Sequence, residues 1–164
     1  MPDQSKDSTL RHVLEETGTI AMVGASTNPV SPSLFVATYF SGRGRRVIPI
    51  NPTRVGETLL GEPVLASIGD IPSNVRIDLL DVFRGSDAVP GIVDEALAHL
   101  MPGLKCIWMQ YGVRHEAAAE KARAHGLIVV QDRCPKVEHM RLFGGPNLAG
   151  IGGVRVSSKL PGNR

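Results

Sequence analysis

The stretch that decides the fold reads Thr19-Ile20-Ala21-Met22-Val23-Gly24-Ala25-Ser26-Thr27-Asn28-Pro29-Val30-Ser31-Pro32. A mostly apolar run ends at a glycine and is followed by small and polar residues. A serine and a proline then supply the capping residue and first residue of a helix. A buried strand that passes through a short loop directly into a helix is the opening unit of an α/β fold.

Further apolar runs follow along the chain, each bounded by glycine, proline or polar residues. Runs this short and continuous are typical of strands that are buried on both faces, as in a parallel sheet covered by helices. They occupy residues 47–50, 77–83, 104–109 and 127–130.

The segments between these runs carry helical signals. One follows Ser31-Pro32 and ends at Gly42, and another, residues 86–100, has an apolar stripe that Ser86 is expected to cap. A third, residues 115–126, is rich in alanine and ends at a glycine. Residues 56–74 show no long period and predict only a short strand and a helical turn.

This alternation predicts an α/β fold with a doubly wound, mostly parallel sheet in a three-layer, Rossmann-like arrangement. The 164 residues suffice for one domain with its own core, which we place at residues 1–142. Residues 143–164 carry six glycines, three basic residues and no acid. Apart from an edge strand predicted at 154–157, they indicate a flexible tail.

Composition argues against several classes of partner. The net charge is +2 and aromatic residues make up 4% of the chain, which is too few for the stacking platforms of a nucleic-acid binder. The two cysteines form neither a disulfide framework nor a zinc knuckle, so we expect a reducing cytoplasm and no metal. No apolar stretch is long enough for a membrane span or a signal peptide.

The loop after the first run is the expected binding site, because open parallel sheets bind ligands beyond the carboxyl ends of their strands. Small residues let the backbone approach a ligand, and free N–H groups attract a phosphate. The alternative is that Gly24 only makes a tight turn. The candidate residues are Gly24, Ala25, Ser26, Thr27, Asn28, Pro29 and Ser31.

The end of the second run suggests which phosphate ligand to expect. The usual glycine fingerprint is absent, and so is an acidic residue that would hold the ribose hydroxyls of NAD. Arg54 follows instead, and a basic side chain suits a ribose phosphate, as in NADP or coenzyme A. Arg43, Arg45 and Arg46 are more simply interpreted as a solvated turn.

Several blocks, taken in order, resemble the family of small single-domain CoA-binding proteins over about residues 10–142. That family is similar in fold to the CoA-binding domain of the succinyl-CoA synthetase α subunit and of ADP-forming acyl-CoA synthetases. The blocks are Val23-Gly24-Ala25-Ser26 with Asn28-Pro29, Val47-Ile48-Pro49-Ile50-Asn51-Pro52, Leu80-Asp81-Val82-Phe83-Arg84, Ile107-Trp108-Met109-Gln110-Tyr111-Gly112 and Val129-Val130-Gln131-Asp132-Arg133-Cys134.

The resemblance implies a place for each part of coenzyme A. The ADP part would lie at the loop of residues 24–27, with the adenosine end near Asn51, Pro52 and Arg54. The pantetheine arm would pass Val82, Phe83 and Arg84, and Gln110, Tyr111 and Gly112 would close the far side of the cleft.

Catalytic residues are harder to find. The related synthetases use a phosphorylated histidine from a second domain and a nucleotide-grasp subunit, and this chain is too short to hold either. His139 is the one histidine worth testing, and an ordinary packed or exposed role is the simpler interpretation. Asp81 and Asp132 lie near strand ends, where carboxylates do acid-base work but more often cap loops.

The sequence therefore favours a non-catalytic CoA-binding module that takes CoA or an acyl-CoA, alone, as a homo-oligomer or with a synthetase partner. An NADP-dependent or acyl-CoA-transforming enzyme and a scaffold without a ligand stay open as alternatives. Gly24→Val is expected to abolish binding and leave the fold largely intact. Cys134 is either a thiol within reach of the pantetheine thiol, its thiolate favoured by Arg133 and Lys136, or a structural cysteine; Cys106 should be buried and inert.

Overall fold

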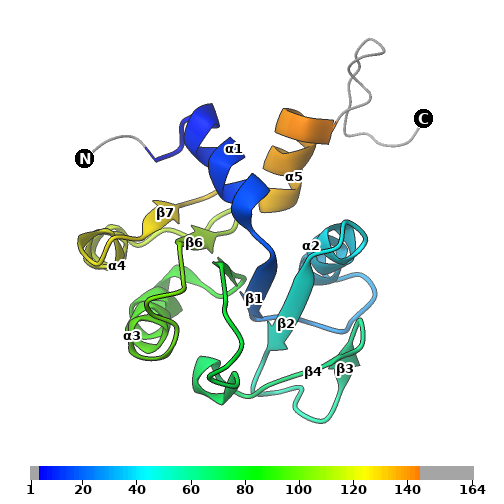
Figure 1. Cartoon of the computed structure of the whole chain (residues 1–164). Helices are drawn as coiled ribbons and strands as arrows, with labels where there is room; N and C mark the ends of the chain where they lie inside the picture. Colours follow the sequence, from blue (N-terminus) through cyan, green and yellow to red (C-terminus); the bar gives the residue numbers. More distant parts are fainter. Residues whose placement is uncertain (1–3, 145–164) are drawn as a thin grey trace.

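The computed structural model describes residues 4–144 and contains a parallel sheet with helices on both faces (Figure 1). The five strands have the order β2-β1-β5-β6-β7, and β3 and β4 form a separate hairpin. The predicted doubly wound, three-layer α/β architecture is confirmed. The strands are β1 (Thr19–Val23), β2 (Arg46–Ile50), β3 (Thr58–Leu59), β4 (Glu62–Pro63), β5 (Leu79–Val82), β6 (Cys106–Met109) and β7 (Ile128–Val130). The helical elements are α1 (Asp7–Glu16), α2 (Pro32–Ser41), η1 (Ile68–Asp70), η2 (Ser86–Ala88), α3 (Val89–His99), α4 (Glu116–Ala124), α5 (Pro135–His139) and η3 (Met140–Gly144).

The strand order reverses next to β1. The chain goes from β1 to β2 on one side of it and then returns to β5 on the other side. Val23 is level with Ile50 of β2 and with Val82 of β5, so three strands end together at one edge of the sheet. The loops that begin at Gly24, Asn51 and Phe83 therefore start side by side at the switch point, where this fold places ligands.

The sheet separates two apolar cores, which explains why its strands read as continuous apolar runs. In β1, Ala21 and Val23 belong to the core under α3 and α4, whereas Ile20 and Met22 belong to the core under α1, α2 and α5. Successive side chains of a strand point to opposite faces, so covering both faces requires apolar residues at every position. Figure 1 shows α3 and α4 together and α1 beside α5.

Two helices and one cap differ from the sequence expectations. Helix α1 lies outside the predicted elements, although Leu10, Val13 and Leu14 have helical spacing and are buried, and α5 is too short to show a period. Ser86 does not cap α3: its hydroxyl accepts the Arg114 N–H at 2.9 Å, and η2 precedes the helix. The expected tail and its edge strand lie outside the described residues, apart from the first two positions of the tail, which belong to η3.

No helix within residues 4–144 has both the length and the apolar character needed to cross a membrane. The same part of the chain contains no group of three or more His, Cys, Asp or Glu side chains arranged to hold a metal ion.

The packing around Gly24 at the switch point leaves no room for a side chain. Its φ is +86°, and a Cβ built on it would lie 2.6 Å from the Phe83 carbonyl oxygen. Because that neighbour is backbone, the structure argues against the sequence-based expectation that Gly24→Val spares the fold. We predict that Gly24→Ala lowers the free energy of unfolding by about 3 kcal/mol or more, since strain from positive φ adds to the clash. Urea unfolding measures the loss.

Gly44→Ala is the matched control, because Gly44 has a φ of +81° and a Cβ added to it would meet no atom within 4 Å. It should cost only about 1 kcal/mol, the contribution of backbone conformation alone. An equal loss in both variants would show that the approach to Phe83 is unimportant.

Candidate functional site

The loop after β1 is held by backbone bonds at its start and by serine hydroxyls further along. The N–H groups of Gly24 and Ala25 both donate to the Ile50 carbonyl oxygen, at 2.8 and 3.3 Å. The Ser26 N–H donates to Ser33 Oγ at 3.0 Å, and the Asn28 N–H donates to Ser26 Oγ at 3.1 Å. Hydroxyl oxygens thus accept from loop N–H groups as phosphate oxygens would, and a hydroxyl can rotate away at low cost.

Ser33 was not among the expected site residues. It occupies the first turn of α2, is buried, and shares a 2.8 Å hydrogen bond with the Ser31 hydroxyl. Ser31 is the residue before α2, as expected, but its side chain makes no capping bond to the helix backbone. The repeated serine after the proline was the available signal for this second polar position.

Asn51 ties the second loop to the first. Its Nδ2 donates to the Ala25 carbonyl oxygen at 2.8 Å, and its Oδ1 accepts from the Thr53 N–H at 3.0 Å and the Thr53 hydroxyl at 2.8 Å. The amide is thus occupied by protein partners on both sides. Asn51 therefore positions the loop, and Pro52 lies exposed in the turn beyond it.

Arg54 lies against the first loop. This position is consistent with the prediction that Arg54 meets a ligand bound there. Its Nη1 donates to Thr27 Oγ1 at 2.9 Å and lies 3.4 Å from Glu57 Oε1. The Thr27 hydroxyl also donates to Glu57 in a short hydrogen bond. That bond, together with the charge of Arg54, lowers the pKa of the Glu57 carboxyl, so this acidic neighbour is ionised at neutral pH.

Arg84 is the second cation at the switch point. It is the second residue after the end of β5, is exposed, and its Cδ would lie 3.2 Å from a Cβ on Gly24. Within residues 4–144 it has neither an ion-pair nor a hydrogen-bond partner. Phe83 packs against the core under α1, α2 and α5, whereas the Val82 side chain is fully buried in the core under α3 and α4. The expected contact of Val82 with a ligand stays a prediction.

The far side of the expected cleft is built differently from the prediction. Gln110 is buried and its Nε2 donates to Asp81 Oδ1 at 2.7 Å, so its side chain is turned into the interior. Gly112 has a φ of +80°, and its N–H donates to Asp132 Oδ1 at 2.7 Å. Asp132 therefore caps a loop, the simpler of its two roles, and Tyr111 is the exposed side chain of this turn.

The remaining polar candidates are interior groups. Cys134 is buried, and burial raises the pKa of its thiol. Arg133, which was expected to favour a thiolate, instead pairs with Glu138, with Nη1 3.3 Å from Oε1. Burial and the raised pKa therefore favour the structural interpretation of Cys134 over a thiolate. Cys106 is buried, as predicted, and burial raises the pKa of its thiol. Burial lowers the pKa of His139 to about 4, and its Nδ1 lies 2.8 Å from the Tyr39 hydroxyl.

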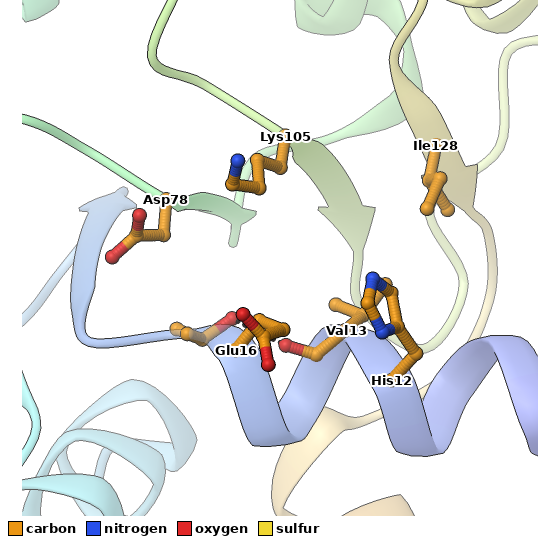
Figure 2. Close-up of a pocket in the computed structure, with 7 residues that line it drawn as sticks. His12, Val13, Glu16, Asp78, Lys105 and Ile128 are labelled. Carbon is orange, nitrogen blue, oxygen red and sulfur yellow. Dashed lines mark hydrogen bonds between the residues drawn. The ribbon is translucent and has the colours of Figure 1, made fainter.

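Two hollows lie away from the loop. Figure 2 shows the smaller, of about 40 Å³, between α1 and the starts of the strands; it is lined by His12, Val13, Glu16, Thr17, Asp78, Lys105 and Ile128. Asp78 there accepts the N–H groups of Gly18 and Thr19, so it holds the chain at the start of β1. The larger, of about 310 Å³, is lined by residues 71–76 and 99–103. Both border the amino ends of the strands, opposite the loop.

The fold and the loop at its switch point define a Rossmann-like α/β domain. Residues 18–140, most of the chain, match the family model described as a CoA binding domain. The chain belongs to this family of CoA binding domains, which confirms the resemblance noted in the sequence.

Individual relatives agree with this assignment. The uncharacterised protein YneT of Bacillus subtilis (strain 168) is 32% identical over 130 residues, covering 79% of this chain and 91% of that protein. A solved structure from Thermus thermophilus has a TM-score of 0.77 at 41% identity and covers 84% of this chain and 99% of its own. A dinucleotide forming acetyl-coenzyme A synthetase of Ca. Korarchaeum cryptofilum has a TM-score of 0.55 at 25% identity, over 68% of this chain and 25% of that one.

Asp81 gives the protein a pH-dependent stability. Its carboxyl is buried, Oδ2 has no hydrogen-bond partner within residues 4–144, and burial raises the pKa from 3.8 to about 7. The folded protein then holds a proton that the unfolded chain releases, so the free energy of unfolding falls as pH rises from about 4 to 7. The loss is on the order of 4 kcal/mol above pH 7. We predict that Asp81→Asn removes this fall and is more stable than wild type at pH 8.

Urea unfolding at pH 5 and pH 8 measures the effect, with exposed Asp87→Asn as the control that should keep the wild-type pH dependence. If Asp81→Asn loses stability between pH 5 and pH 8 as steeply as wild type, the buried carboxyl is not responsible.

The burial of both cysteines predicts their chemical inertness. Treating the native protein with CoA disulfide should give no mixed disulfide on Cys134 or Cys106, because neither thiol is accessible or readily ionised. Intact mass spectrometry measures the adduct, and the urea-unfolded protein is the positive control. An adduct on the native protein that disappears in Cys134→Ser would restore the reactive interpretation.

Proposed function

We propose that the protein binds coenzyme A, or an acyl-CoA, at the loop of residues 24–31 and acts as a non-catalytic CoA-binding module. The observation that carries the proposal is the pair of cations at the switch point, with Arg54 on the Thr27 side and Arg84 beside Gly24. A CoA molecule has phosphates at two places, a pyrophosphate and a ribose phosphate. Membership of the family of CoA binding domains indicates CoA as the ligand. The two cations suit the two phosphate groups of CoA.

The chemistry of each part supports this arrangement. The pyrophosphate would replace serine hydroxyls as acceptor of loop N–H groups, with Arg84, which has no partner in the described part of the chain, beside it. Arg54 would donate to the ribose phosphate. The pantetheine arm would then run past Phe83 toward exposed Tyr111, rather than past the side chains of Val82 or Gln110.

A binding role without chemistry agrees with the state of the titratable groups. His139 is neutral at physiological pH and shares a hydrogen bond with Tyr39, and the Cys134 thiol stays protonated. Neither group meets the requirements of a nucleophile or an acid-base catalyst. We infer that any reaction of the bound CoA takes place on a partner, either a second copy of the chain or synthetase subunits. The two free cysteines favour the cytoplasm.

We predict that Arg54→Ala weakens CoA binding about 10-fold and leaves the affinity for dephospho-CoA nearly unchanged. A charge-assisted contact at a partly exposed site accounts for this magnitude. Isothermal titration calorimetry with CoA and dephospho-CoA measures both affinities. Wild type should prefer CoA, and Arg54→Ala should lose that preference.

Two further arginines make the comparison specific. Arg84→Ala should weaken the binding of CoA and of dephospho-CoA equally, because both ligands contain the pyrophosphate. Arg46→Ala removes an exposed cation at the other end of β2 and should change neither affinity by more than about twofold. Tight binding of NADPH without CoA binding would replace the proposal with the NADP-dependent alternative, and binding of neither would favour a scaffold.

A further inference from the structure

Glu57 competes for the cation that is expected to meet the ribose phosphate. Thr27 Oγ1 donates to Glu57 Oε1 and at the same time accepts from Arg54 Nη1 at 2.9 Å. Arg54 Nη1 lies 3.4 Å from the same carboxylate oxygen. The three side chains thus form one closed group, with Glu57 on the guanidinium nitrogen that also contacts the loop.

The backbone holds Glu57 at this position. Its N–H donates to the Arg54 carbonyl oxygen at 3.1 Å, and its carbonyl oxygen accepts the Val64 N–H at 3.0 Å. The β3–β4 hairpin begins at the next residue, so Glu57 is fixed at the base of that hairpin. The side chain itself is 45% exposed, which leaves it free to rotate into solvent.

A phosphate that reaches Arg54 meets a carboxylate already in place. Two anions on one guanidinium nitrogen repel each other, and in a partly exposed site this repulsion is weakened by water without vanishing. The Glu57 side chain must therefore swing away before the phosphate can take its full contact. A ligand without the ribose phosphate leaves the group of three side chains undisturbed.

We propose that Glu57 sets the affinity of this site for CoA. Its carboxylate pairs with Arg54 in the unliganded protein, and the ribose phosphate of CoA displaces it. The inference rests on the proposed function. It assigns Glu57 the role of a competitor that weakens CoA binding. It also links occupancy of the site to the base of the β3–β4 hairpin, which the displaced side chain no longer ties to Thr27.

The test is Glu57→Gln, which removes the charge and keeps the shape. Its Kd for CoA should fall about 3- to 10-fold, the range expected when an exposed ion pair and its repulsion of a phosphate are removed. Its Kd for dephospho-CoA should change by less than about twofold. In the Arg54→Ala background, Glu57→Gln should no longer improve CoA binding, because no guanidinium is left to compete for.

Glu62→Gln is the matched control. Glu62 lies on the same hairpin and pairs with Arg46 at 2.7 Å, so the substitution makes the same change in net charge. It should alter CoA affinity by less than about twofold. Thermal unfolding of each variant verifies that the hairpin and the fold are retained.

Other outcomes overturn the inference in distinct ways. Weaker binding of both ligands to Glu57→Gln would mean that Glu57 accepts a ribose hydroxyl, and an equal gain for both would mean a general effect of charge. Unchanged CoA affinity in Glu57→Gln, with wild type binding CoA, would refute the competitor role alone. Absence of CoA binding to wild type would refute the proposed function instead.

Discussion

The site depends on the close backbone approach between the ends of three neighbouring strands. Ile50 offers its carbonyl oxygen to two successive N–H groups of the first loop, and Gly24 brings that loop to the Phe83 carbonyl without room for a Cβ. The strands end level, so these contacts set where each loop starts. Small displacements there would separate the loop from both arginines, because Arg54 and Arg84 lie in the loops that begin at the ends of β2 and β5.

The two arginines of the site differ in how they are paired. Arg84 is exposed and has no partner within residues 4–144, so it is available for an anion without rearrangement. Arg54 is held by Thr27 and Glu57, so an anion must exchange with a carboxylate. An exposed ion pair contributes about 1 kcal/mol or less, and such an exchange therefore adjusts affinity rather than preventing binding.

Four polar groups near the carboxyl ends of β5, β6 and β7 and in α5 belong to the interior. All four are buried: Asp81, Gln110, Cys134 and His139. Gln110 donates a hydrogen bond to Asp81, and His139 shares one with the Tyr39 hydroxyl. Only Asp81 Oδ2 is left without a partner among the described residues. Burial favours the neutral form of the carboxyl, the thiol and the imidazole alike, which reduces their reactivity.

The sequence by itself determined the order of the five sheet strands and of helices α2, α3 and α4, the glycine loop and the cation at Arg54, but neither α1 nor α5. These are local features: the apolar runs and the Ser31-Pro32 start of α2 depend on neighbours in the chain. Residue type at a strand end also predicted that Arg54 lies near the loop, and the structure places it on Thr27.

Tertiary structure alone decided which side chains face the ligand edge and which face the core. Gln110 and Cys134 follow strands just as Arg84 does, yet the first two are buried and Arg84 is exposed. Glu57 reaches Thr27 only because the turn after β2 folds back toward the first loop, a path that no short motif specifies. Side-chain direction and charge pairing depend on contacts between distant segments, and periodicity along the chain carries no information about those contacts.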